Sequence, residues 1–163
     1  MNLILRALPK EELISGLRNV VMYFNEWSND HKFGLILFGS RVNGIPRIDS
    51  DIDLFYLHLQ GQGNFVQVYR ELGNSIDGCL LRWGVIPLYI NRYVVGKEFL
   101  ERASNDKGYR AELLRTRLGL LDKYSLYLGP DEEENNCLLR RALDLEFREP
   151  YAPDFIWIRD GRG

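Results

Sequence analysis

The sequence predicts an α/β (α+β) fold in which a small mixed β-sheet is flanked by helices. A strongly periodic helical segment leads directly into a short apolar strand. An alternating strand follows a polar connection, and further helical patterns fill the second half of the chain. At 163 residues, with 45% hydrophobic and 27% charged residues, the chain has the size and composition of one globular unit with its own core.

The first helix is expected from Pro9 to Trp27. Its apolar residues recur at helical spacing, and Pro9, Glu11 and Glu12 are residue types that favour a helix start. The nearly continuous apolar run from Phe33 to Phe38 then predicts a buried strand. The chain should therefore pass from the helix into the sheet through a short turn.

A second strand is expected from Asp51 to Leu59, where the residue types alternate. One side of such a strand carries Asp51, Asp53, Phe55 and Leu57, and the other carries Ile52, Leu54, Tyr56 and His58. The strand therefore presents two aspartates on the same side.

The middle of the chain is expected to hold a turn, a short helix and two strands. Gly61 to Asn64 forms the turn, Phe65 to Leu72 the helix, and Gly73 with Asn74 ends that helix. Two strands then follow, Ser75–Trp83 and Val85–Val95, joined at Gly84. Pro87 places the second strand at a sheet edge because proline cannot donate a backbone hydrogen bond.

The remaining chain is expected to be helical with an extended end. Helices are predicted at Phe99–Ala103 and Tyr109–Leu121, and another begins after Asp131, whose side chain would cap it. The last helix would bury Leu138, Leu139, Ala142, Leu143 and Phe147. The tail from Tyr151 to Gly163 would dock through Phe155, Ile156 and Trp157. We expect residues 1–128 to form the main domain, with 129–163 as a C-terminal helix and docked tail of the same unit.

Charge and cysteine content narrow the class of protein. A net charge of −2 argues against a surface that coats long nucleic acid. Cys79 and Cys137 lie far apart and give no thiolate metal site or disulfide framework, which favours a reducing compartment. The start of the chain lacks the features of a signal peptide, and no apolar run approaches the length of a bilayer span. We expect a soluble, cytoplasmic protein without a membrane partner.

The residues with the clearest chemistry lie between Phe38 and Leu54. A strand ends at Phe38, Gly39 lets the backbone approach a phosphate closely, and Ser40 offers a hydroxyl at an expected helix start. Arg41 and Arg47 add permanently charged donors for a triphosphate or a leaving pyrophosphate. These residue types together predict an anion-binding turn.

Asp51 and Asp53 are two residues apart on a strand, so both carboxylates project from one face. Hard oxygen ligands in this arrangement suit Mg²⁺, which serves phosphoryl transfer by neutralising charge on the phosphates. The alternative is an ordinary turn followed by a solvated strand edge. Alternating carboxylates on an otherwise apolar strand are costly without a cation, which favours the metal site.

Gly39, Ser40, Asp51 and Asp53 resemble the Gly-Ser, ten-residue, Asp-x-Asp signature of the DNA polymerase beta-like nucleotidyltransferases, especially the minimal nucleotidyltransferases. Arg41, Gly44 and Ser50 also stand where minimal members commonly place these residues. The resemblance implies a magnesium-dependent enzyme that moves a nucleoside monophosphate, with AMP from ATP expected, to a hydroxyl group and releases pyrophosphate.

The resemblance leaves the acceptor open. Minimal nucleotidyltransferases of similar size act as antitoxins that adenylylate a partner toxin on tyrosine, so a small helical toxin protein is an expected partner. An aminoglycoside-type acceptor is the alternative, although those enzymes usually carry a larger helical domain. Polymerases and enzymes that extend tRNA ends are disfavoured because no sizeable basic second domain is present. Homo-oligomerisation is left open.

The family also uses a third carboxylate, on a neighbouring strand, as metal ligand or base. Asp77 is the candidate if Ser75–Trp83 lies beside the Asp51 strand, and a turn aspartate is the alternative interpretation. If Val85–Val95 is the neighbouring strand instead, the position falls near Asn91 or Arg92 and the acid is missing. That arrangement would favour a weakened enzyme or a nucleotide- or partner-binding module.

The two histidines are not expected to be catalytic. His31 stands in a polar turn and His58 near a strand end, where surface or packed side chains are common.

Overall fold

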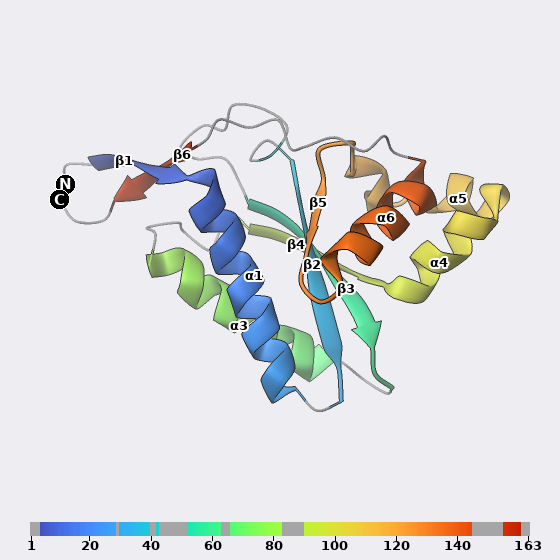
Figure 1. Cartoon of the computed structure of the whole chain (residues 1–163), viewed down its shortest axis with the longest axis horizontal. Helices are drawn as coiled ribbons and strands as arrows, with labels where there is room; N and C mark the ends of the chain where they lie inside the picture. Colours follow the sequence, from blue (N-terminus) through green and yellow to red (C-terminus); the bar gives the residue numbers. More distant parts are fainter. Residues whose placement is uncertain are drawn as a thin grey trace.

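The computed structural model describes residues 4–28, 30–39, 42, 52–62, 66–82, 90–144 and 155–160. Within them the chain forms the predicted α+β fold, a four-stranded mixed sheet with helices on both sides (Figure 1). Predictions that concern other residues, such as the burial of Phe147 and the turn at Asn64, lie outside the described residues.

The sheet has the strand order β4-β3-β2-β5. These strands are Ile90–Gly96, Ile52–Gln60, Lys32–Phe38 and Leu126–Leu128. Strand β2 is antiparallel to both β3 and β5, whereas β3 and β4 run parallel. The predicted strands at Phe33–Phe38 and Asp51–Leu59 are thus confirmed over their described residues. The predicted edge strand corresponds to β4, which stands at one edge of the described sheet.

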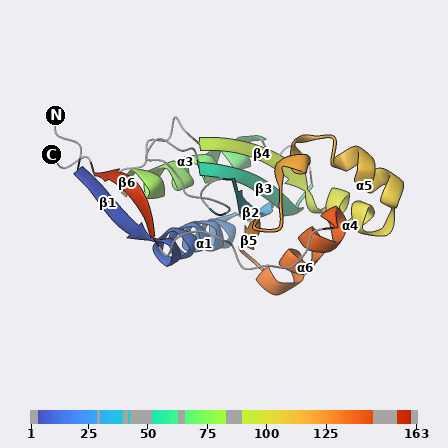
Figure 2. The same ribbon diagram turned by 90° about the horizontal axis from the view of Figure 1, so that it is seen from above.

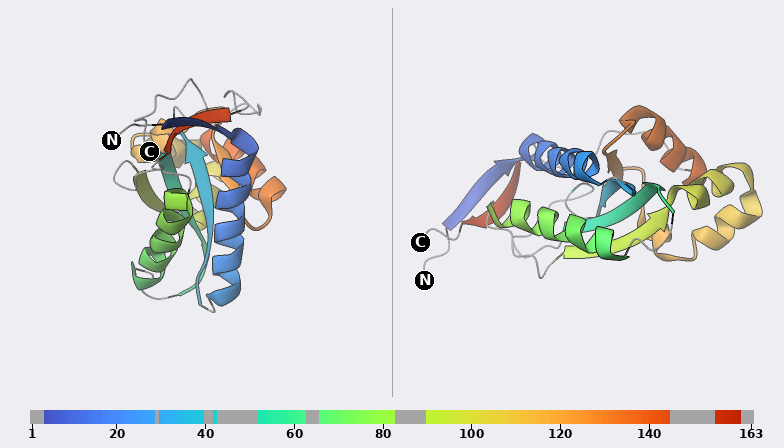
Figure 3. Two further views of the ribbon diagram at one scale, coloured as in Figure 1. Left: turned by 90° about the vertical axis from the view of Figure 1, so that its left-hand side faces the viewer. Right: turned by 90° about the horizontal axis from the view of Figure 1, so that it is seen from below.

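One face of the sheet is covered by α1 (Lys10–Trp27) and α3 (Val66–Arg82), which lie on the same side (Figure 3). Their apolar residues and those of the sheet form a buried cluster, which we name the first core. It includes Leu13, Leu17, Val21, Ile52, Leu54, Tyr56, Leu72 and Ile76. The predicted helix from Pro9 to Trp27 is confirmed, and Pro9 itself ends the preceding strand.

Helix α3 corrects two predictions. Gly73 and Asn74 do not end a helix, and Ser75–Trp83 is not a strand, because α3 runs without a break from Val66 to Arg82. Leu72, Ile76 and Cys79 recur at helical spacing and are buried, and this burial offsets the cost of about 1 kcal/mol for a glycine inside a helix. A helix is also the usual connection between two parallel strands such as β3 and β4.

The opposite face is covered by α4 (Lys97–Asn105), α5 (Lys107–Leu113) and α6 (Glu132–Leu143). A second core forms here, which includes Ile36, Phe38, Phe55, Leu57, Tyr127, Leu138 and Leu139. The helices predicted at Phe99–Ala103 and after Asp131 are confirmed. Asp131 does occupy the N-cap position, but its φ is 54° and its side chain makes no capping hydrogen bond.

The predicted helix from Tyr109 to Leu121 is instead two short elements. Helix α5 ends at Leu113, and a 3₁₀ turn spans Arg117–Leu120. Thr116 separates them: its hydroxyl donates to the Leu113 carbonyl at 2.5 Å and accepts from the Leu118 amide at 3.3 Å. A side chain that bonds to the backbone in this way competes with the helical pattern.

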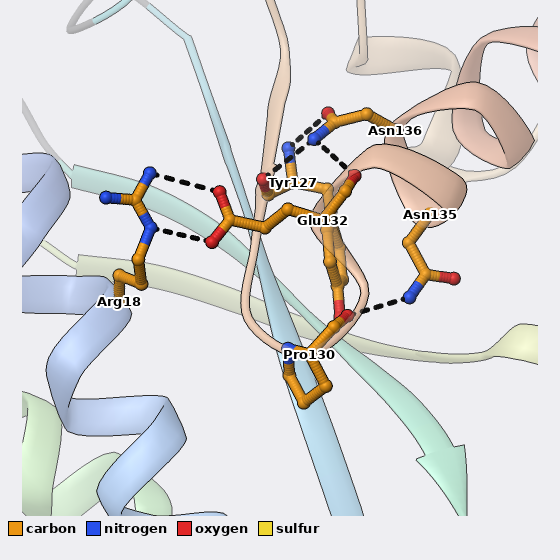
Figure 4. A network of polar contacts seen from close by, with 6 residues as sticks. All are labelled: Arg18, Tyr127, Pro130, Glu132, Asn135 and Asn136. Carbon is orange, nitrogen blue, oxygen red and sulfur yellow. Dashed lines mark hydrogen bonds and ion pairs between the residues drawn. The ribbon is translucent and has the colours of Figure 1, made fainter.

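Strand β5 and helix α6 are held by side-chain amides (Figure 4). Asn136 accepts from the Tyr127 amide at 2.9 Å and donates to the Tyr127 carbonyl at 3.1 Å, so it pairs with β5 like a further strand residue. The Tyr127 hydroxyl donates to the Pro130 carbonyl at 2.6 Å. The Arg18 guanidinium meets Glu132 at 2.6 and 3.0 Å, which ties α1 to α6.

The two ends of the chain pair with each other. Strand β1 (Ile4–Pro9) is antiparallel to β6 (Phe155–Asp160), with Ala7 opposite Trp157. This ribbon lies at one end of the molecule, and α4 and α5 lie at the other (Figure 2). The tail is therefore extended as predicted, but it pairs as a strand with the N-terminal segment. The side-chain contacts expected of Phe155, Ile156 and Trp157 lie outside what is described.

Candidate active site

The candidate site begins at the turn that follows β2. Gly39 has a φ of +83°, a conformation that residues with a side chain rarely adopt. The Val42 amide donates to the Gly39 carbonyl at 3.1 Å, and the Val42 side chain, 1% exposed, is part of the first core. The turn is thus fixed by one backbone hydrogen bond and by a buried anchor.

The Asp53 carboxylate lies directly against Gly39. Phe38 is the register partner of Asp53 across the β2–β3 pair, so the turn and the aspartate meet at the same end of the sheet. A Cβ on Gly39 would collide with Oδ2 of Asp53 and would lie 3.1 Å from its Cγ. Two parts of the motif that are 14 positions apart in the sequence therefore meet, and glycine is required at the point of contact.

Asp53 belongs to the side of β3 that faces α4 to α6. Successive strand residues point to opposite faces, and Phe55 and Leu57, which share the parity of Asp53, are in the second core. Ile52, Leu54 and Tyr56 are in the first core. The alternation predicted for this strand is confirmed. Four other predicted site residues lie outside the described residues. They are the phosphate-binding candidates Ser40, Arg41 and Arg47 and the metal-ligand candidate Asp51.

Asp77 does not stand on a strand beside β3. It lies in α3, next to Ile76, and α3 packs on the face of β3 opposite to that of Asp53. The prediction of Asp77 as the third carboxylate depended on a strand at Ser75–Trp83, and that strand is wrong. The spacing of Tyr69, Leu72, Ile76 and Cys79 was the signal for a helix.

The strand that neighbours β3 is β4, and its register identifies the position beside Asp53. Asn91 is the register partner of Asp53, and Arg92 is the partner of Leu54. This is the alternative considered above, in which an amide stands where the third acid was expected. Asn91 is neutral and has no basic lone pair at physiological pH, so it cannot serve as a general base.

The two histidines of the chain lie in contact, which the sequence did not indicate. His31 Nδ1 and His58 Nε2 are 2.9 Å apart, and the His58 ring also stacks near Phe33 with centroids 5.1 Å apart. His31 is 3% exposed. Burial and the neighbouring His31 lower the pKa of His58 below 6.5, and Glu98 opposes this shift. His31 is thus one of the packed side chains that the sequence led us to expect.

No protein-family model matches this chain, and no match to a curated protein was found. In the described part of the chain, no helix is both long and apolar enough to cross a membrane. The same part contains no group of three or more His, Cys, Asp or Glu side chains arranged to hold a metal ion. Of the two predicted metal ligands, it includes only Asp53.

Proposed function

We propose that the chain is a magnesium-dependent nucleotidyltransferase that moves a nucleoside monophosphate, AMP in the first instance, from a nucleoside triphosphate to a hydroxyl group. The observation that supports this most directly is the contact between Gly39 and Asp53. A glycine whose conformation and neighbours disfavour a side chain and a carboxylate from the adjacent strand meet at one end of the sheet. Phosphate binding and metal binding need these two features side by side.

Each part of the motif has a defined role in this proposal. The backbone at Gly39 lets a phosphate come close, and Ser40, Arg41 and Arg47 donate hydrogen bonds to its oxygens. Asp51 and Asp53 would hold Mg²⁺, which would supply positive charge against the triphosphate. Hard carboxylate oxygens fit this ion, and the Asp53 carboxylate lies against the Gly39 turn, where we propose that the phosphates bind.

Asn91 supports a second candidate function. The register partner of Asp53 is an amide, so among the described residues no carboxylate stands at the position where we expected the third acid, which would act as base for the acceptor hydroxyl. The chain would then bind nucleotide and magnesium without rapid transfer, as a nucleotide- or partner-binding module. We place the enzyme first because phosphoryl transfer depends mainly on positioning and charge, so loss of a base weakens the reaction without abolishing it.

The acceptor is a hydroxyl of a protein or of a small molecule. A tyrosine on a small helical toxin protein is our first proposal, and an aminoglycoside is the alternative. Both follow from the resemblance to minimal nucleotidyltransferases. A cytoplasmic location is part of the same proposal, since nucleoside triphosphates and magnesium are available there.

Calorimetry with ATP, GTP, CTP and UTP, each with and without Mg²⁺, tests the proposal. We expect magnesium-dependent binding of at least one triphosphate to the native chain and its loss in Asp53→Asn. Asp77→Asn is the matched control, because it makes the same change on the opposite face of the sheet. Failure of all four nucleotides to bind would refute both candidate functions. Binding without pyrophosphate release in the presence of an acceptor would select the binding module.

A further inference from the structure

A cavity of about 610 Å³ lies beside the sheet, on the side of α4 and α5. Its wall is formed by Phe55 and His58 of β3, by β4 residues from Tyr93 to Gly96, by Glu98 and Phe99 of α4, and by residues of α5 and the 3₁₀ turn. Of these elements, α4 and α5 lie at the end of the molecule away from β1 and β6, and β3 and β4 lie in its middle (Figure 2). The volume is within the range of sites that bind small organic molecules.

Four aromatic side chains contribute to the cavity wall. Phe55, Tyr93, Phe99 and Tyr109 all line it, and Phe99 is 45% exposed although it is large and apolar. The rings of Phe38, Phe55 and Tyr93 form a continuous series across three strands, with centroids 5.0 and 5.1 Å apart. Phe38 and Phe55 are buried in this series, so the lining rings with exposed surface are the half-buried Tyr93 and Tyr109 and the exposed Phe99. An exposed ring face or edge can pack against a further flat ring.

Two oppositely charged groups also line the cavity. The Arg117 guanidinium lies 4.2 Å from the centroid of the Tyr93 ring, and Glu98 stands at the start of α4. Neither has an ion-pair partner among the described residues. The cavity therefore offers hydrogen-bond donors from Arg117 and an acceptor from Glu98 around aromatic walls. An apolar cavity with a few polar groups of this kind orients a ligand as well as holding it.

We propose that this cavity binds a planar aromatic group that carries hydrogen-bonding atoms on its edge. The ring stacks against the aromatic wall, an acceptor atom on its edge meets Arg117, and a donor atom meets Glu98. A nucleobase and a phenol-type ring share this chemistry, and either is a candidate ligand. The proposal does not depend on the nucleotidyltransferase activity, since every group that it uses lies outside the Gly39 turn.

Fluorescence titration with 8-anilinonaphthalene-1-sulfonate, without magnesium or nucleotide, tests whether the cavity binds aromatic rings. We expect saturable binding that weakens by about fivefold or more in Phe99→Ala and in Arg117→Ala. The controls are Leu120→Ala and Arg115→Ala, which remove an exposed apolar and an exposed cationic side chain outside the cavity. These four residues are exposed, so the variants should fold, and circular dichroism checks this.

Competition then identifies the ring that the cavity prefers. Adenosine represents a nucleobase without phosphates, and N-acetyltyrosine amide represents a phenol. Displacement of the probe by either one supports the proposal and names the ligand class. Equal effects of the cavity variants and their controls, or no displacement by both competitors, would overturn it. Neither result bears on magnesium-dependent triphosphate binding, which calorimetry measures separately.

Discussion

On β3, adjacent residues face two different environments. Ile52, Leu54 and Tyr56 pack under α1 and α3 in the first core, where almost every neighbour is apolar. Asp53 and Phe55 face the other side, where a glycine turn, a series of aromatic rings and a cavity lie on or beside the second core. The comparison teaches that the two sides of one strand differ in what they carry: the side under α1 and α3 holds a core alone, whereas the other side holds the second core together with the candidate site. A substitution under α1 and α3 should change the free energy of unfolding, and one at Asp53 should change ligand binding.

Leu54→Ala should have the largest effect. Leu54 is fully buried, and its truncation leaves a cavity in the first core, so we expect a loss of about 2–5 kcal/mol in the free energy of unfolding. Urea denaturation followed by circular dichroism measures it. Leu120→Ala is the control, since Leu120 is 58% exposed and its loss should change stability by less than about 0.5 kcal/mol. Similar values for the two variants would contradict the assignment of Leu54 to the core.

Asn91→Asp tests whether the position beside Asp53 in the sheet can supply the third carboxylate. If the position opposite Asp53 is that of the missing acid, a carboxylate there should raise pyrophosphate release by about a hundredfold through general base catalysis. A coupled pyrophosphate assay with a hydroxyl acceptor measures the rate. Asp77→Asn should leave the rate unchanged, because α3 lies on the opposite face. A large loss of turnover in Asp77→Asn would instead return that residue to the mechanism.

Gly39 and Gly78 provide a matched pair of sites for substitution by alanine. Gly39→Ala places a side chain at a φ of +83° and against the Asp53 carboxylate, so it should cost about 1–2 kcal/mol of stability and weaken triphosphate binding. Gly78→Ala, in α3, meets nothing within 4 Å and should stabilise the chain by about 0.5–1 kcal/mol. Thermal denaturation of both variants checks the signs. A neutral or stabilising effect of Gly39→Ala would show that the turn does not need glycine.

The lowered pKa of His58 predicts a smaller effect, a dependence of the free energy of unfolding on pH. Because the pKa of His58 is lowered below 6.5 in the folded chain, the unfolded chain binds the proton more tightly. The contribution of this group to stability is therefore complete above pH 6.5 and is lost as the pH falls through the lowered pKa. Urea midpoints at pH 7.5, 6.5 and 5.5 should fall more steeply for the native chain than for His58→Gln. Parallel curves would mean that the pKa of His58 is not lowered in the folded chain.

Local sequence patterns were sufficient to predict the helix and the strands that surround the motif from Gly39 to Asp53. The helical spacing of Leu13, Leu17 and Val21 predicted α1, and the alternation from Ile52 onward predicted both faces of β3. The close contact between Gly39 and Asp53 agrees with the interpretation of their fixed spacing as one site. These features depend on the repeat of a helix or strand, which a sequence displays directly.

Contacts between residues far apart in the sequence decided the features that local patterns did not predict. Gly73 and Asn74 indicated a turn, yet burial of Leu72 and Ile76 against the sheet kept α3 helical, so Asp77 lies on a helix. Three further features depend on residues far apart in the chain. They are the contact between His31 and His58, the β1–β6 ribbon and the cavity beside β4.

The sequence by itself determined the periodicity of α1, β2, β3 and α6 and the residue types of the glycine turn and its aspartates, because each is encoded by near neighbours. Only the tertiary structure decided that β4 lies parallel to β3 and that Asn91 stands opposite Asp53. The physical reason is that strand order and register follow from which apolar faces can be buried together. That burial depends on the whole fold and on no single segment.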